Sequence, residues 1–293
     1  MQQQFPWPEG KRAAVALTFD MDGETVPYAL DPDNASRRVS LMSEMAYGPN
    51  VGMPRILELL DLYEIRASVF VPGFTAERHP DLLREIVARG HDLGHHGYMH
   101  ERPDGLSDEV ERKVLVRGIE VLAEITGQAP TGYRSPAAEL KPSTPALLVE
   151  HGFVFDSTLM GADHPYIVPT ENGELIELPM YWHHDDWPLF GFVSVPPVGN
   201  GISAPSAGFD IWSEAFEGLY ERGGLFNLCM HPFLTGRPAN LRLLERLIRF
   251  VRGFPRVWWA PLSEIAAHCR LPEVRSGMLR HEPVVPQAKW ITD

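Results

Sequence analysis

The sequence is poor in cysteine, in long apolar runs and in positive charge, and each shortage excludes a class of protein. Its 293 residues include only two cysteines, Cys229 and Cys269, so no disulfide framework is expected. No run approaches the roughly 18 uninterrupted apolar residues of a membrane-spanning helix. The N-terminal segment also lacks the basic and then apolar pattern of a secretion signal. We therefore expect a cytoplasmic protein.

The charge balance bears on the partners of the protein. Acidic residues outnumber lysine and arginine by 39 to 26, which gives a formal net charge of −13. Nucleic-acid binding needs clustered cations that displace counterions, and docking on an anionic membrane needs basic residues as well. Neither nucleic acid nor a membrane is therefore expected as a partner. The hydrophobic fraction of 44% is that of an ordinary globular protein with a large core.

Short apolar, β-branched runs alternate with amphipathic stretches along most of the chain. The expected strands are 13–19, 66–71, 92–94, 131–134, 174–178, 225–230 and 256–260. The expected helices are 53–63, 79–90, 107–127, 144–152, 209–223 and 241–253. Several of these helices end at glycine, the usual left-handed stop. Strands that alternate with helices predict a parallel sheet, and about seven repeats favour a closed or nearly closed α/β barrel over an open sheet.

Two long connections and a tail interrupt this alternation. Residues 24–52 and 161–206 are rich in proline and glycine, and long loops that follow barrel strands usually build the rim of an active site. Residues 271–293 are predicted to form an extended arm. Because no linker or repeat is evident, we expect one domain over 1–293, with its core at about 13–268.

The first group of polar residues is Asp20 and Asp22, in the segment TFDMDGE at the end of the first predicted strand. Strand alternation places both carboxylates on the same side of the backbone. Two such close carboxylates repel each other unless a cation lies near them. A metal bound by one, with the other free as a base, resolves the repulsion. A solvated turn with helix-capping acids is the alternative.

The second group is His96 and His100, in GHHGYMH. On one helical turn this spacing presents two imidazoles to a common point. With 12 histidines, however, composition alone yields roughly half a pair of this spacing in the chain. His91 and His95 form a second pair, but it spans a predicted strand, where the spacing covers ~13 Å and cannot chelate one ion. The spacing alone therefore leaves metal ligands and structural histidines about equal, and the nearby carboxylates favour the metal.

The third and fourth groups are single residues, Arg134 in GYRSPAAE and His231 after LFNLCM. An arginine at a strand end can form a bidentate pair with a carboxylate and keep it ionised, although a surface arginine is the simpler alternative. A lone histidine after a core strand is more often a hydrogen-bonded structural residue. All four groups, however, lie just past the ends of predicted strands, where α/β barrels assemble their catalytic residues. Their coincidence at this edge favours one shared site.

Taken in order, these motifs resemble those of the polysaccharide deacetylase superfamily, also called NodB-homology or carbohydrate esterase family 4 hydrolases. The resemblance covers roughly residues 13–268. The motif T-F-D-D-G appears as 18–23 with one extra residue between the acids, and H-[ST]-x-x-H appears as 96–100 with glycine in place of the hydroxyl residue. R-x-P appears as 134–136, and L-x-H appears as 228–231, one residue longer. The resemblance implies an α/β fold, a distorted (β/α)7 barrel of the NodB type.

The Asp-x-Asp variant, the long segment 24–52 and the stretch 178–190 resemble one branch of this family. That branch contains Helicobacter-type peptidoglycan deacetylase, allantoinase-like and cyclic imide hydrolase members. Allantoinase-like members can lack the metal ligands, but Asp22, His96 and His100 are all present here. The branch also implies a homo-oligomer, a tetramer.

The resemblance implies a metal-dependent hydrolase of non-peptide C–N bonds. The metal ligands would be Asp22, His96 and His100. The ion, Zn²⁺ or another divalent transition metal, would polarise the substrate carbonyl and bring the pKa of a bound water toward ~7. Asp20, paired with Arg134, would accept the water proton, and His231 would protonate the departing nitrogen. Residues expected to contact the substrate are Glu24, Pro136, Trp182, Asp185 and Asp186.

An acetamido sugar and a cyclic imide present the same amide carbonyl to such a site, so the loops around it decide the substrate. Two long loops and the missing secretion signal favour a small cyclic imide or ureide. N-deacetylation of peptidoglycan or chitin-like oligosaccharides, that is of an N-acetylated glycan, is the alternative. A catalytically silent binding protein and a purely structural metal site are two further alternatives.

Overall fold

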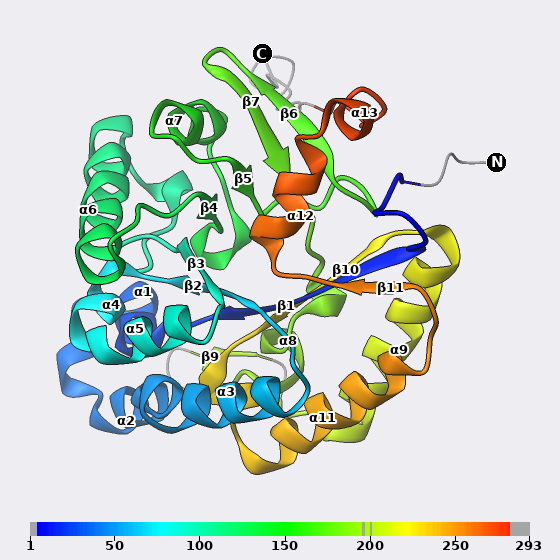
Figure 1. Ribbon diagram of the computed structural model, residues 1–293. Helices are drawn as coiled ribbons and strands as arrows, with labels where there is room; N and C mark the ends of the chain where they lie inside the picture. The colour runs from blue at the N-terminus through cyan, green and yellow to red at the C-terminus, as the bar shows by residue number, and fades with distance from the viewer. Residues whose placement is uncertain (1–4, 195–196, 200, 282–293) are drawn as a thin grey trace, which may run out of the picture.

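A curved sheet of nine strands forms the centre of the molecule (Figure 1) in the computed structural model, which describes residues 5–194, 197–199 and 201–281. The strands are β1 (Ala13–Asp20), β2 (Ser68–Val71), β3 (Asp92–His95), β4 (Gly132–Tyr133), β5 (Phe155–Asp156), β6 (Tyr166–Thr170), β7 (Gly173–Glu177), β10 (Leu225–Met230) and β11 (Val257–Trp259). Their order is β10-β1-β2-β3-β4-β5-β7-β6, and β11 pairs with the start of β1. All pairings are parallel except that of β6 with β7. The predicted distorted barrel of the NodB type is confirmed.

Strand β1 lies at the centre of the sheet and is buried along its whole length. It pairs with β10 from Ala14 to Phe19, with β11 at its start and with β2 at its end. A strand covered on both faces has no solvent side, so its sequence is a continuous apolar run rather than an alternation. Its carboxyl end delivers Asp20 to the rim of the barrel.

Helices cover the outside of the sheet (Figure 1). The six that the sequence predicts are α3 (Met53–Leu62), α5 (Pro80–Ala88), α6 (Asp108–Thr126), α7 (Thr144–Glu150), α9 (Pro205–Arg222) and α11 (Pro238–Arg252). The further helices are α1 (Val26–Leu30), α2 (Val39–Tyr47), α4 (Gly73–Arg78), α8 (Trp187–Phe190), α10 (Pro232–Thr235), α12 (Leu262–Cys269) and α13 (Pro272–Arg275). Within the described ranges, no helix combines the length and apolar character needed to cross a membrane.

Three expectations about the irregular segments need correction. Segment 24–52 is largely helical, because it contains α1 and α2. Segment 161–206 contains the expected strand at 174–178 as β7, and in addition β6, which pairs with it, α8 and the two short strands β8 (Val193–Ser194) and β9 (Pro197–Val198). The tail is not simply extended, since it begins with α13 and then pairs with β6 through Leu279 and His281, which bond to the backbone of Ile167. The remainder of the predicted arm, 282–293, lies outside the described residues.

Over the described residues no strand pairing joins β10 to β7, and hydrogen bonds to the segment after β7 bridge this side of the barrel. Asn227 donates through Nδ2 to the carbonyls of Leu178 and Pro179, at 3.2 Å each. A single backbone bond then joins the amide of Asp186 to the carbonyl of Cys229 at 3.2 Å. The closure brings the segment around Asp186 to the carboxyl end of β10, next to His231.

Candidate active site

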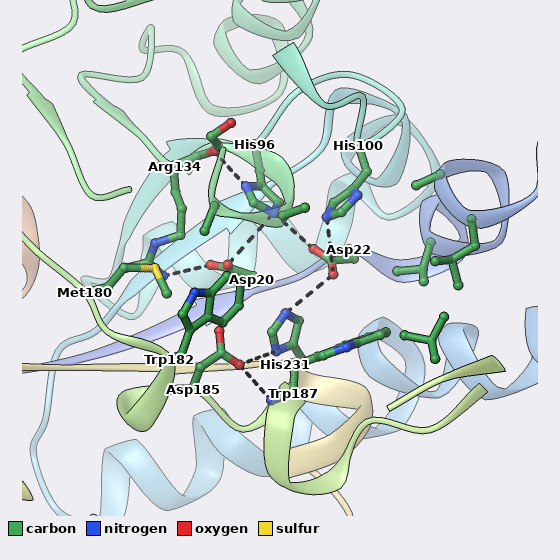
Figure 2. A pocket seen from close by; sticks show the side chains of 17 residues that line it. Asp20, Asp22, His96, His100, Arg134, Met180, Trp182, Asp185, Trp187 and His231 are labelled. Atoms are coloured by element: carbon green, nitrogen blue, oxygen red, sulfur yellow. Dashed lines mark hydrogen bonds and ion pairs between the residues drawn. The ribbon is translucent and has the colours of Figure 1, made fainter. Parts of the chain in front are cut away.

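A cavity of about 230 Å³ opens at the carboxyl ends of the strands (Figure 2). Eight of the predicted site residues line it: Asp20, Asp22, His96, His100, Arg134, Trp182, Asp185 and His231. Three others lie elsewhere. Glu24 faces His79 and Arg78 instead, Pro136 packs against Gly97 behind the wall, and Asp186 lies beneath His231. These three residues do not line the cavity, and their expected contacts with the substrate stay predictions.

Asp22, His96 and His100 converge at one side of the cavity. Asp22 Oδ1 lies 3.4 Å from His96 Nε2, and Asp22 Oδ2 lies 3.8 Å from His100 Nε2. One ligand atom from each residue falls within 4.8 Å of the others. The spacing suggests that the two histidines share a helical turn, but they do not. The segment after β3 is a loop in which His100 has a φ of +61°, and this turn brings the second imidazole back toward the first.

Backbone bonds orient the first two of these residues. The hydroxyls of Thr25 and Thr75 donate to the carbonyl of Asp22 at 2.8 and 2.5 Å. His96 Nδ1 lies 2.7 Å from the carbonyl oxygen of Arg134. Because a carbonyl can only accept, Nδ1 carries the proton and the lone pair of a neutral ring is on Nε2, which faces Asp22.

The three side chains fit a divalent transition metal. Within the described part of the chain, Asp22 Oδ1 has no hydrogen-bond donor although it is buried, and a buried unpaired polar atom is rare without an ion or a water beside it. Burial lowers the pKa of His100 to about 4, so its imidazole is neutral at physiological pH. Burial opposes ionisation of Asp22, but the surrounding imidazoles outweigh it and hold the pKa below its ordinary value. Burial opposes protonation of His96, but Asp20 and Asp22 outweigh it and raise its pKa, so its Nε2 would have to release a proton to bind an ion. A carboxylate and two imidazoles are a common donor set for zinc.

Asp20 and Arg134 form a buried ion pair beside this group. Arg134 Nη1 donates to Asp20 Oδ1 at 2.9 Å, and the thiol of Cys229 donates to Asp20 Oδ2 at 3.3 Å. A bidentate pair was expected, but only Nη1 bonds to Asp20, because Nη2 donates to the hydroxyl of Ser157 at 2.9 Å. Burial opposes ionisation of Asp20, but the guanidinium and His96 outweigh it, so the pKa of Asp20 lies below its usual value. Asp20 is thus a carboxylate able to accept a proton.

Arg134 is only 1% exposed, which excludes the alternative of a surface arginine. Its Nε donates to the carbonyl of Ser157 at 2.9 Å, its Nη1 also donates to the Thr18 hydroxyl at 2.8 Å, and its guanidinium lies 4.3 Å from the ring centre of Phe70. A planar donor held on every side keeps Asp20 in one orientation.

His231 faces the same cavity from β10, opposite Asp20. Its Nδ1 lies 2.7 Å from Asp186 Oδ1, and its Nε2 lies 3.7 Å from Asp22 Oδ2. Asp186 is fully occupied, because it also accepts from the backbone amide of His231 at 3.0 Å and from the Thr235 hydroxyl at 2.5 Å. Burial opposes protonation of His231, but the carboxylates of Asp186 and Asp185 outweigh it and raise its pKa well above the usual value. His231 is therefore an imidazolium that can donate a proton from Nε2.

Sequence reasoning missed several residues of the cavity wall. Met180 and Trp187 line it, as do Ala137 and Ala138. The two alanines have φ values of +56° and +53°, which are uncommon for residues with a Cβ. Nothing in the local sequence signals these angles. Trp187, which directly follows Asp185 and Asp186, could have been included with them.

Comparison with known proteins places this site in a family. Residues 8–155 match the polysaccharide deacetylase family. The peptidoglycan deacetylase of Helicobacter pylori is 31% identical over 80% of this chain and 87% of its own length. The structure of a candidate polysaccharide deacetylase from Mycobacterium smegmatis is 41% identical and superposes with a TM-score of 0.91 over 97% of this chain and 98% of that one. Puue allantoinase is 25% identical with a TM-score of 0.81, over 92% of this chain and 94% of that one.

Deacetylation of an amide breaks a C–N bond by hydrolysis, which is the reaction class that the motifs predict. The chain belongs to the polysaccharide deacetylase family.

Proposed function

We propose that this chain is a metal-dependent enzyme that removes N-acetyl groups from amino-sugar oligomers of the peptidoglycan or chitin type. The observation that carries the proposal is the arrangement of the cavity: three metal-type ligands on one side, flanked by the carboxylate Asp20 and the imidazolium His231. The sequence had favoured a small cyclic imide or ureide. The similarity to Helicobacter pylori peptidoglycan deacetylase over most of both chains favours the acetylated glycan instead.

The proposed mechanism divides the proton transfers between Asp20 and His231. A divalent ion such as Zn²⁺, held by Asp22, His96 and His100, would polarise the amide carbonyl and make water more acidic. Asp20 accepts a proton from the attacking water while the water oxygen bonds to the carbonyl carbon. His231 donates a proton from Nε2 to the nitrogen as the C–N bond breaks. The products are acetate and a free amine.

The positioning partners keep each group in the right protonation state. Arg134 holds Asp20 ionised and in place, while Asp186 stabilises the protonated form of His231 through Nδ1. A base and an acid with opposite pKa shifts, on two sides of one cavity, suit an amide hydrolysis in which one group takes a proton and the other gives one.

The shape of the cavity constrains how a polymer would bind. At about 230 Å³ it holds the reacting part of a substrate rather than a long chain. The indole of Trp182 lines the cavity and is 47% exposed, so it offers an apolar platform to a neighbouring sugar. A polymer would therefore lie across the mouth and insert one acetamido group.

Hydrolysis assays with the purified, zinc-loaded protein test this proposal. Acetate release from N-acetylated glucosamine oligomers is the expected result. The same panel contains succinimide, hydantoin, dihydrouracil and allantoin. Asp20→Asn should lower the rate by about 10²- to 10⁴-fold, with circular dichroism as a check that the variant is folded. Hydrolysis of the rings with no acetate release from the oligomers would contradict the proposal.

Opening of a small cyclic imide or ureide is the second candidate function. It is supported by the similarity to Puue allantoinase over 92% of the chain and by the apolar side chains around the cavity. The silent binding protein would be eliminated by turnover of any compound in the panel. The single-domain organisation, the cytoplasmic location and the homo-oligomeric state stay predictions.

A further inference from the structure

Asp185 and Asp186 are neighbours in the chain, are both buried and differ in how their oxygens are used. Both oxygens of Asp186 accept hydrogen bonds. Asp185 is 3% exposed and lines the cavity. Its Oδ1 accepts from the amide of Trp187 at 2.7 Å and lies 3.8 Å from His231 Nδ1. Over the described ranges of the chain, no donor bonds to its Oδ2.

The free oxygen of Asp185 is directed into the cavity. Figure 2 shows one oxygen turned toward His231 and Trp187, and the other turned away from both, toward the side where Asp20 and Trp182 lie. A carboxylate oxygen removed from bulk water is costly unless a hydrogen bond replaces the lost hydration. Burial raises the pKa of Asp185 to about 7 against the attraction of His231, which agrees with a carboxylate oxygen that has lost its hydration.

The rest of the wall offers few polar groups. Apart from the proposed metal and catalytic residues, it is made of aliphatic and aromatic side chains from α1, from 137–138 and from the segment 180–198. Ser135 also lines the cavity, but its hydroxyl is engaged as a donor to the carbonyl of Glu139. In such surroundings a single carboxylate oxygen discriminates strongly between substrates with and without a donor.

We propose that Asp185 is a substrate-specificity residue whose Oδ2 accepts a hydrogen bond from an O–H or N–H group that the substrate carries beside the scissile amide. The inference rests on the proposed function. In an N-acetylated amino sugar that group is the hydroxyl on the carbon next to the acetamido carbon. A second ring N–H, as in hydantoin, has the same chemistry in the second candidate function.

Two small amides that differ by one hydroxyl test this inference: trans-2-acetamidocyclohexanol and N-cyclohexylacetamide. The measured quantity is the ratio of their kcat/KM values, from acetate release by the zinc-loaded full-length protein. The wild type should prefer the alcohol by about 10- to 100-fold, the range for one hydrogen bond to a charged group. The ratio cancels any general loss of catalytic power.

Asp185→Asn is the informative variant. Its Oδ1 can still accept from the Trp187 amide, which places the Nδ2 donor where Oδ2 was and opposes the donor of the substrate. The preference should therefore fall to about 1. Asp186→Asn is the matched comparison. Because Asp186 acts through His231, this variant should lower both kcat/KM values by the same factor and leave the ratio unchanged.

The outcomes separate the inference from the function on which it rests. A wild-type ratio near 1, or a ratio that Asp185→Asn leaves unchanged, overturns the role of Asp185 while acetate release keeps the proposed function. A wild type that releases acetate from neither amide nor from N-acetylated glucosamine oligomers overturns the function and the inference together.

Discussion

Two histidine pairs with the same spacing follow one another in this chain, His91 with His95 and His96 with His100. In the first pair, His91 Nδ1 accepts from the amide of Ala67 at 3.0 Å. His95 Nδ1 accepts from the amide of Gly97 at 3.1 Å, so its protonated Nε2 donates to the carbonyl of Leu115, also at 3.1 Å. In the second pair, both rings face Asp22 at one side of the cavity.

The difference arises from strand geometry. His95 is the last residue of β3 and points outward to α6, where Gly118 leaves room for its ring. Side chains alternate along an extended backbone, so the next residue, His96, points the other way, into the barrel. Spacing along the sequence is therefore a weak guide to a metal site, whereas the side of the strand on which each ring falls decides its surroundings.

Removal of one histidine from each pair tests whether only the second pair binds a metal. His96→Ala takes away a proposed ligand, and we expect loss of bound zinc and a fall in kcat/KM of at least about 10³-fold, since a metal ion supplies several kcal/mol to such a reaction. Metal content after dialysis and acetate release measure both effects. His91→Ala is the control, and the folded variant should still bind the metal. Full activity of His96→Ala would end the metal assignment.

Gly118→Ala tests the structural pair. A Cβ there would lie 2.1 Å from His95 Nε2, and the ring cannot move freely because it is stacked on Tyr133 and touches Phe153 edge-on. We expect the free energy of unfolding to fall by about 1–3 kcal/mol, as for other overpacked cores. Gly218→Ala in α9 is the matched control. Nothing lies within 4 Å of its Cβ position, so it should be neutral or stabilising by up to ~1 kcal/mol. Equal unfolding curves for the two variants would contradict the tight fit.

The smallest effect concerns the pH dependence of His91. Burial lowers its pKa in the folded state from 6.5. Above pH 6.5 both states are neutral. Below pH 6.5 the unfolded chain binds a proton that the folded chain does not. The free energy of unfolding therefore decreases as the pH is lowered, by no more than about 1.4 kcal/mol per pH unit. His91→Gln removes this dependence. Urea unfolding between pH 5 and 8 should show the wild-type advantage shrinking below pH 6.5, and parallel curves would count against a neutral, buried His91.

Much of the fold was predictable because its longest elements have the clearest patterns. Strands β1 and β10 are continuous apolar runs, and α6 and α11 have amphipathic repeats, so local sequence is enough to place them. Strand β5 has two residues and no pattern of its own, and it exists because β4 and β7 pair with it on either side. The helices within 24–52 were missed because their prolines and glycines predict a loop.

The sequence by itself determined which residues could do chemistry here. These residues, Asp20, Asp22, His96, Arg134 and His231, lie at or just past the ends of predicted strands, and the carboxyl ends of parallel strands meet at one edge of a sheet. This rule depends only on the direction of the strands, so it can be applied to the sequence without a structure.

Only the tertiary structure decided how the polar groups divide their work. Asp185 and Asp186 are adjacent and chemically identical. Asp186 bonds to Nδ1 of His231, whereas Asp185 keeps one oxygen free in the cavity. The turn that brings His100 back to Asp22 and the thiol beside Asp20 are equally invisible in the sequence. Each depends on contacts between segments that lie far apart in the chain, and no local pattern encodes those distances.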